Sequence, residues 1–208
     1  MKKISTITLL FILSTVQVFA QSLQRELGFA EKAETTLDSI YKHFGIRGET
    51  LLRENYPFDE SYKASYLAGS DQGNRGNAYS YLWPFSGSLS AQVARLEING
   101  DKHILNDIES KVLPGLEHYY DKRTPYGYAS YVSSAPQSDR FYDDNVWLGI
   151  DFSDLYLNTK DRKYLNKAEE IWKFVESGMD DKLGGGIYWC EQKKESKNTC
   201  SNAPAVVY

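Results

Sequence analysis

Only two cysteines and three histidines occur among the 208 residues, and basic residues do not outnumber acidic ones. A zinc site usually needs four Cys or His ligands at short spacings, and His43, His103 and His118 are scattered along the chain. The net charge of -4, from 24 Lys and Arg against 28 Asp and Glu, offers no basic surface for a phosphate backbone. The sequence therefore implies no metal or organic cofactor and argues against nucleic acid as a partner.

The chain also has no apolar run long enough to span a membrane. The run from Ile7 to Phe19 follows a short basic start, contains Ser14, Thr15 and Gln17, and ends in the small-x-small pattern Val18-Phe19-Ala20. A spanning helix needs about 20 apolar residues, whereas a shorter run with these flanks is typical of a secretory signal. We expect residues 1–20 to be cleaved and the mature protein to be periplasmic or extracellular, without stable membrane insertion.

Export changes the interpretation of the two cysteines. Cys190 and Cys200 lie close together in a polar stretch. In an oxidising compartment they are candidates for a disulfide that closes a small loop and stabilises the fold by roughly 2 to 3 kcal/mol. The alternative is a pair of unlinked thiols.

Helical spacing recurs at an interval of about 60 residues. The run 161–166 (DRKYLN) opens an apolar face that continues to Val175, and Gly178 then supplies a stop signal. The run 101–106 (DKHILN) has the same layout, and each run is preceded by another expected helix, at 89–98 and at 146–157. A weaker copy at 32–34 predicts a third helical hairpin near the start of the mature chain.

These repeats predict an all-α fold, an (α/α)6 toroid in which inner and outer helices alternate. A closed ring of six such hairpins needs roughly 360 residues, so residues 21–208 account for about half of one. Ser201 and Pro204 indicate a helix start close to the end of the chain, with Ser201 as N-cap. We therefore expect an N-terminal part of a catalytic domain, truncated to about half the ring.

Two adjacent carboxylates, Asp143 and Asp144, stand at the start of an expected helix. Neighbouring residues on a regular helix point about 100° apart, so both acids can face one cleft only near its terminus. The helix N-terminus stabilises one anion, and two close acids cannot both ionise freely, so their pKa values should be driven apart. A glycosidase needs one anionic nucleophile and one protonated acid of this kind, although such a pair before a helix is more often an N-cap followed by a residue that the helix dipole favours.

Aromatic residues make up 14% of the chain, and many lie in polar, Gly-rich stretches. In the 60-residue register Trp83 matches Asp143, which predicts an aromatic surface on the same rim as the acids. Tyr and Trp pair an apolar ring with a polar group, as sugar-binding surfaces require. The three glycines at 184–186 predict a tight turn leading into a strand.

Four motifs resemble those of glycoside hydrolase family 76. They are YLWPF at 81–85, FYDDNVWLG at 141–149, GGGIYW at 184–189 and CSNAPA at 200–205. The resemblance covers most of residues 25–208 and implies a secreted endo-acting α-1,6-mannanase with an (α/α)6 fold and a retaining mechanism. α-Mannan would then be the substrate.

The resemblance implies that Asp143 is the nucleophile and Asp144 the general acid and base. Tyr142, Asn145, Trp83 and Trp189 are candidate sugar contacts, and packing is the alternative role for each of them. The competing hypotheses for the chain are a non-catalytic glycan-binding helical protein, a structural helical repeat, and an inactive fragment of the hydrolase.

Overall fold

The computed structural model describes residues 28–63 and 76–208 and separates into two units, 1–40 and 41–208. In the first unit the described residues, from 28 onward, are helical, and this helix continues to residue 44. It matches the second helix of the expected third hairpin. The preceding helix of that hairpin, the signal segment 1–20 and residues 21–27 of the expected domain lie outside the described residues.

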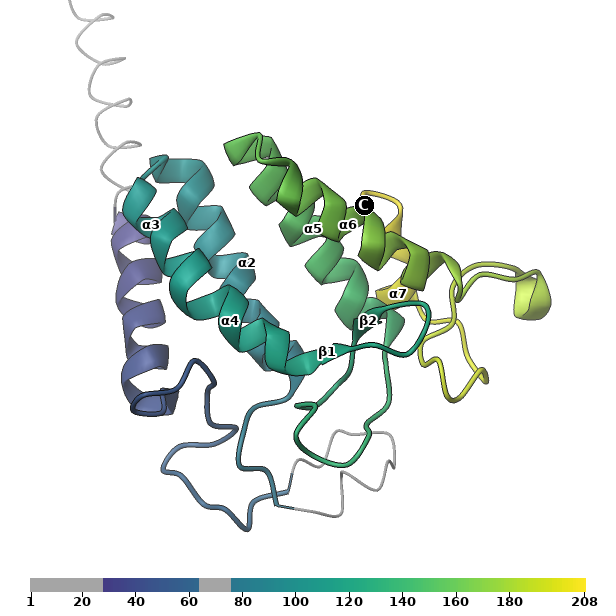
Figure 1. Ribbon diagram of the computed structural model, residues 1–208, viewed down its shortest axis with the longest axis horizontal. Coiled ribbons are helices and arrows are strands. Elements are labelled where there is room, and N and C mark those ends of the chain that lie inside the picture. The colour runs from purple at the N-terminus through teal and green to yellow at the C-terminus, as the bar shows by residue number, and fades with distance from the viewer. Residues whose placement is uncertain (1–27, 64–75) are drawn as a thin grey trace, which may run out of the picture. The chain divides into compact units, whose positions relative to one another are not determined.

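The second unit contains two helical hairpins and a short helix near the end of the chain (Figure 1). The first hairpin pairs α2 (Leu82–Asn99) with a composite helix, and the second pairs α5 (Tyr142–Thr159) with α6 (Arg162–Glu176). The composite helix consists of α3 (Lys102–Asp107), the π-helical η2 (Ile108–Val112), α4 (Leu113–Leu116) and the 3-10 turn η3 (Glu117–Tyr119). Helix α7 (Thr199–Ala205) packs against α5. The all-α prediction is confirmed.

The repeat is visible in the helix ends. Helices α2 and α5 begin at Leu82 and Tyr142, and each is followed directly by a residue in the left-handed conformation, Gly100 or Lys160. Each feature therefore recurs 60 positions later. The next helices start in the same way, because Asp101 and Asp161 each accept a hydrogen bond from the backbone N–H two residues on. Such caps contribute about 1 kcal/mol each and fix the sharp turn of the hairpin.

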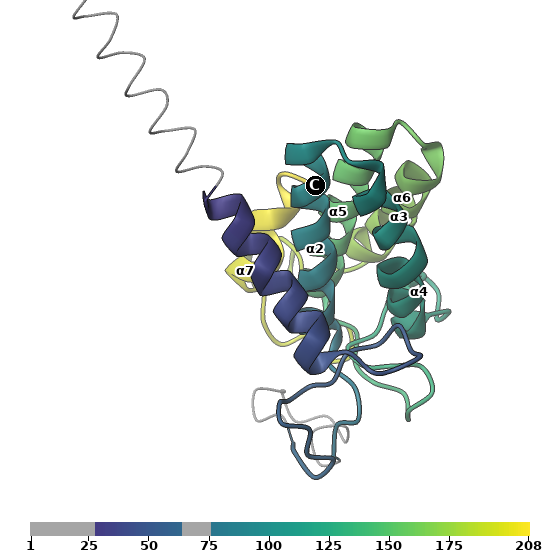
Figure 2. The same cartoon turned by 90° about the vertical axis from the view of Figure 1, so that its left-hand side faces the viewer.

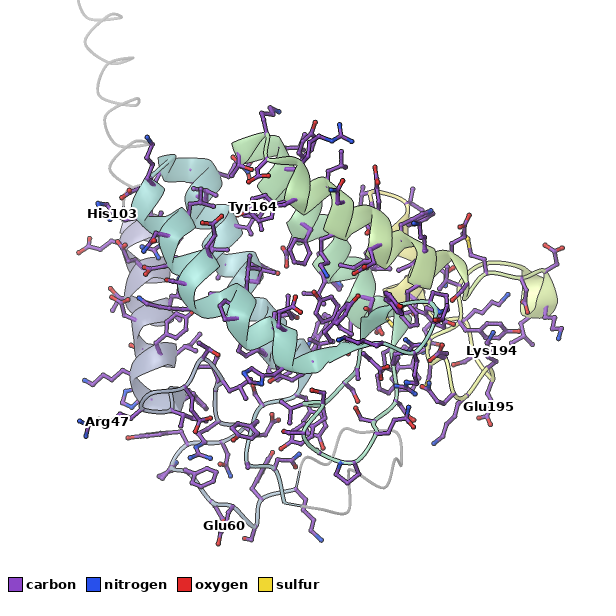
Figure 3. All side chains as sticks on the ribbon, in the orientation of Figure 1. Arg47, Glu60, His103, Tyr164, Lys194 and Glu195 are labelled. Atoms are coloured by element: carbon purple, nitrogen blue, oxygen red, sulfur yellow. The ribbon has the colours of Figure 1, made fainter. Side chains whose placement is uncertain are left out.

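Two layers result from this pattern. Helices α2 and α5 pack side by side, while α3, α4 and α6 lie together on one side of them (Figure 2). Several apolar side chains of α5 and α6 are fully buried; they are Val146, Leu148, Leu155, Ile171, Phe174 and Val175. Each contributes roughly 1.5 to 3 kcal/mol by burial. Tyr164 of α6 also donates to Glu109 of η2 at 2.6 Å, which links the two outer helices (Figure 3).

Helix starts and loops gather at one end of this unit. The two-residue strands β1 (Tyr120–Asp121) and β2 (Gly127–Tyr128) pair antiparallel there, with Tyr120 opposite Tyr128. The long loops that follow α4 and α6 lie at this same end (Figure 1). The N-termini of α2 and α5, which carry Trp83 and the two adjacent acids, also lie at this end (Figure 1).

Three local expectations need correction. Helix α2 starts at Leu82 and not near Leu89, because Pro84 is tolerated in a first turn and Ser86 and Ser88 bond back to nearby carbonyls. Helix α7 starts at Thr199 after Asn198, so Ser201 lies inside the helix and is not its cap. Gly184, Gly185 and Gly186 form the expected tight turn at φ of 88 to 90°, but Ile187 forms only an isolated bridge with Met179.

Asp151 is a buried acid between the two inner helices. Its Oδ2 accepts a hydrogen bond from Ser90 Oγ at 2.7 Å, and burial raises the pKa of Asp151 to about 7. Between pH 4 and 7 the folded protein keeps a proton that the unfolded chain releases, so stability decreases as pH rises through this range.

We expect Asp151→Asn, which keeps the acceptor, to increase the free energy of unfolding by about 2 to 4 kcal/mol at pH 8 and to leave it nearly unchanged near pH 4. Urea denaturation at both pH values measures this difference. A gain of equal size at the two pH values would contradict a charge origin.

Candidate active site

The two adjacent acids occupy the first turn of α5. Phe141 is extended and Tyr142 is the first helical residue, so Asp143 and Asp144 follow at the second and third positions. The positive end of the helix dipole lies there and favours a negative charge. Both side chains are about nine-tenths buried, with 9% and 8% of their surface exposed. The predicted position of the acids at a helix start is confirmed.

Asp143 is surrounded by hydrogen-bond donors from other parts of the chain. The indole Nε1 of Trp189 donates to Oδ2 at 3.1 Å, and the Cys200 thiol and backbone N–H groups of the first turn also favour the anion. Oδ1 is buried and has no partner of full hydrogen-bond geometry among the described residues. Burial raises the pKa of Asp143, and the donors oppose this rise.

Asp144 has the opposite environment. Burial raises the pKa of its carboxyl well above the usual range, and the negative charge of Asp143 raises it further. Within the described residues no side chain donates a hydrogen bond to it. The two carboxyls are therefore unequal: the environment of Asp144 favours its protonated form more strongly, and Asp143 is the better anion. This is the combination that acid-assisted displacement at a sugar carbon requires.

Tyr142 and Asn145 are buried and make contacts inside the protein, and sugar contact by either of them stays a prediction. Tyr142 is 1% exposed and stacks on Phe174 with ring centroids 4.8 Å apart. Asn145 is fully buried; its Oδ1 accepts from the Tyr128 N–H at 2.8 Å, and its Nδ2 donates to the carbonyls of Tyr128 and Phe141. These two side chains fix the start of α5 to β2 and α6.

The two tryptophans lie differently. Trp83 is in the first turn of α2, at the position equivalent to Asp143, and 52% of its surface is exposed. Trp189 is half-buried, with its ring 4.8 Å from that of Phe141 and its indole N–H on Asp143. Stacking of either ring on a sugar stays a prediction.

Cys190 and Cys200 are free thiols, so the disulfide considered above is not formed. Cys190 is buried in a bridge with Phe141, where its thiol lies 3.9 Å from the Gln192 amide oxygen. Cys200 belongs to α7 and interacts with Asp143. The two residues are held by different neighbours, which explains why closeness in sequence does not pair them.

A pairing between distant segments supports the acids, and it was not predicted. The Tyr142 N–H donates to the Trp189 carbonyl at 2.9 Å, the Glu191 N–H donates to the Arg140 carbonyl at 3.0 Å, and the Arg140 N–H donates to the Gln192 side chain at 2.8 Å. Residues 140–142 thus run against 189–192. No local pattern in the sequence predicts this pairing, because its partners are about 50 residues apart.

Arg140 secures the pairing from inside the protein. Its side chain is 1% exposed and forms a two-pronged ion pair with Glu191. Its guanidinium also donates to the carbonyls of Arg123 and Pro125, both at 2.8 Å, and lies 4.6 Å from the Phe174 ring centre. Arg140 immediately precedes the motif at 141–149, and nothing in the sequence predicted this supporting role.

Two further findings concern only residues 28–63 and 76–208. No cluster of three or more His, Cys, Asp or Glu side chains there could hold a metal ion. No helix there is long and apolar enough to cross a membrane.

Comparison with known proteins adds the family. No curated protein sequence matches this chain. Among solved structures, a family 76 glycoside hydrolase (mannosidase) from Bacteroides thetaiotaomicron VPI-5482 is 28% identical with a TM-score of 0.67, covering 86% of this chain and 46% of its own. A family 76 enzyme from a bovine strain of that species is 30% identical with a TM-score of 0.66, covering 86% and 36%.

A third solved structure is an inactive variant of an α-1,6-mannanase of Salegentibacter sp. HEL1_6 in complex with α-1,6-mannotriose. Two adjacent aspartates are replaced by asparagine in that variant. It is 25% identical to this chain with a TM-score of 0.60, covering 86% of this chain and 43% of its own. This chain spans less than half the length of each of the three structures and corresponds to part of their helical toroid. The sequence model of Glycosyl hydrolase family 76 matches residues 57–208, so the chain belongs to this family.

Proposed function

We propose that this chain carries the acid pair of an exported glycoside hydrolase that cleaves α-1,6-mannan internally with retention of configuration. The observation that carries the proposal is the unequal environment of Asp143 and Asp144 at the start of α5. The family supports it, and so does the mannanase that binds α-1,6-mannotriose and is inactive when two adjacent aspartates are replaced. Export rests on the pattern of residues 1–20.

The proposed reaction has two steps. In the first, the Asp143 carboxylate forms a bond to the anomeric carbon C1 of a mannose. The bond from C1 to the leaving O6 breaks, and that oxygen takes the bonding electrons together with the proton of Asp144. In the second step, Asp144 takes a proton from water while the water oxygen bonds to C1 and Asp143 leaves as a carboxylate. Two inversions give net retention.

The test is product release from linear α-1,6-mannan by the full chain. The expected products are oligosaccharides of several lengths, first formed as the α-anomer in a proton NMR time course. The matched protein is Asp144→Asn, which keeps the size and hydrogen-bonding capacity of the side chain. Products that begin as the β-anomer would contradict retention, and the absence of products would contradict catalysis by this chain.

A further inference from the structure

The indole of Trp189 contacts the acid that we propose as nucleophile. Its Nε1 donates to Oδ2 of Asp143 at 3.1 Å, from a residue 46 positions away in the sequence. A hydrogen bond from a neutral N–H to a carboxylate has direction, so it restrains rotation of the carboxylate group and favours its anionic form. The contact therefore acts on the orientation of Asp143 and on its charge.

Trp189 is itself held on the side of α5. Its carbonyl accepts from the Tyr142 N–H, and the next residue, Cys190, bridges Phe141. The Arg140 ion pair with Glu191 then closes this pairing in the interior. The backbone of Trp189 is thus fixed relative to the first turn of the helix that carries Asp143.

The backbone of Trp189 also contacts a second segment, residues 196 and 197, which a buried ammonium group holds in place. The backbone N–H of Trp189 donates to the Ser196 carbonyl at 3.0 Å, and Lys197 is the residue after Ser196. The Lys197 side chain is 5% exposed; its Nζ donates to the carbonyl and Oδ1 of Asp180, both at 2.6 Å, and to the Lys182 carbonyl at 2.7 Å. Lys194 and Glu195, at the outer turn of this loop, lie away from the helices (Figure 3).

These contacts hold Trp189 in place beside Asp143. We propose that Trp189 is a positioning residue, which holds the carboxylate of Asp143 in one orientation and in its anionic form through the indole N–H. This inference rests on the proposed function, because it deepens the role of Asp143 in that reaction. It differs from the expectation that the Trp189 ring stacks on a sugar, since the group that acts is the N–H and the group acted on is the nucleophile.

The first test follows the indole N–H signals and needs no mannan cleavage. The chain has four tryptophans, so a nitrogen-15 correlation spectrum should contain four indole signals, each assigned by its loss in one Trp→Phe variant. We expect the Trp189 signal to move with pH as Asp143 titrates and to stay still in Asp143→Asn. A Trp189 signal that does not move, or that moves equally in Asp143→Asn, would overturn the inference even if mannan is cleaved.

The second test removes the donor and keeps an aromatic ring. In Trp189→Phe the carbon-13 carboxyl signal of Asp143 should titrate at higher pH than in the natural chain. Trp172→Phe is the matched control, because Trp172 packs on Tyr208 from α6 and should leave that titration unchanged. An unchanged Asp143 titration in folded Trp189→Phe would overturn the inference.

Kinetics give a third readout in the mannan assay. Trp189→Phe should lower kcat about tenfold or more, because it removes a hydrogen bond to a charged group. KM should change little, and the acidic limb of the pH–rate profile should move to higher pH. A higher KM with unchanged kcat would instead assign the ring to sugar binding and overturn the positioning role.

Discussion

Asp143→Asn is expected to lose cleavage of every mannoside, whereas Asp144→Asn should lose it only where the leaving group needs a proton. The nucleophile forms a bond in the reaction, so its replacement should lower kcat by about 10⁴-fold or more on any substrate. A general acid contributes about 10² to 10⁴-fold, and an aryl mannoside with an acidic phenol does not need that help to leave. The environments of the two carboxyls predict this assignment and not the reverse.

The measurement compares linear α-1,6-mannan with an activated aryl α-mannoside for both variants. Azide added to Asp144→Asn should restore turnover of the aryl substrate and yield the α-mannosyl azide, since azide attacks the covalent intermediate without a general base. Asp154→Asn is the matched control on the same helix and should stay within about twofold of the natural chain. Formation of the α-mannosyl azide by Asp143→Asn, and not by Asp144→Asn, would reverse the roles.

The hairpins could be predicted because their signals are local. Asp101 and Asp161 cap their helices within two residues, and the left-handed positions Gly100 and Lys160 terminate the preceding helices within one turn. The same register placed Trp83 at the position of Asp143, and both residues do lie in first turns. Periodicity and caps depend on neighbours in sequence, so one sequence is enough to read them.

The contacts of the site could not be predicted, because they join segments far apart in the chain. Asn145 is next to the acids in sequence, yet its side-chain amide forms hydrogen bonds with the backbone N–H and carbonyl of Tyr128, 17 residues earlier. Trp189 was predicted only as a candidate sugar contact, and the hydrogen bond from its indole N–H to Asp143 was not predicted. Residue type alone does not distinguish a polar group that binds a ligand from one that satisfies buried backbone groups.

Arg140 illustrates how much of the site depends on such long-range support. Replacement of Arg140 by methionine keeps side-chain length but removes the buried charge, so Glu191 loses its ion-pair partner and the carbonyls of Arg123 and Pro125 lose their donor. Breaking a buried ion pair from one side typically costs about 3 to 5 kcal/mol. We expect Arg140→Met to lower the free energy of unfolding by about this amount, measured by urea denaturation.

Two comparisons separate the loss of the buried pair from a general effect of removing an arginine. Arg162→Met makes the same change at the exposed start of α6 and should alter stability by about 0.5 kcal/mol or less. Addition of Glu191→Gln to Arg140→Met removes the unpaired charge and should recover part of the loss, because uncompensated charge is the main cost of breaking the pair. Strictly additive losses would show that Arg140 acts through its carbonyl contacts alone. Any recovery would show that the ion pair between Arg140 and Glu191 stabilises the protein, and this ion pair lies in the pairing that includes Trp189.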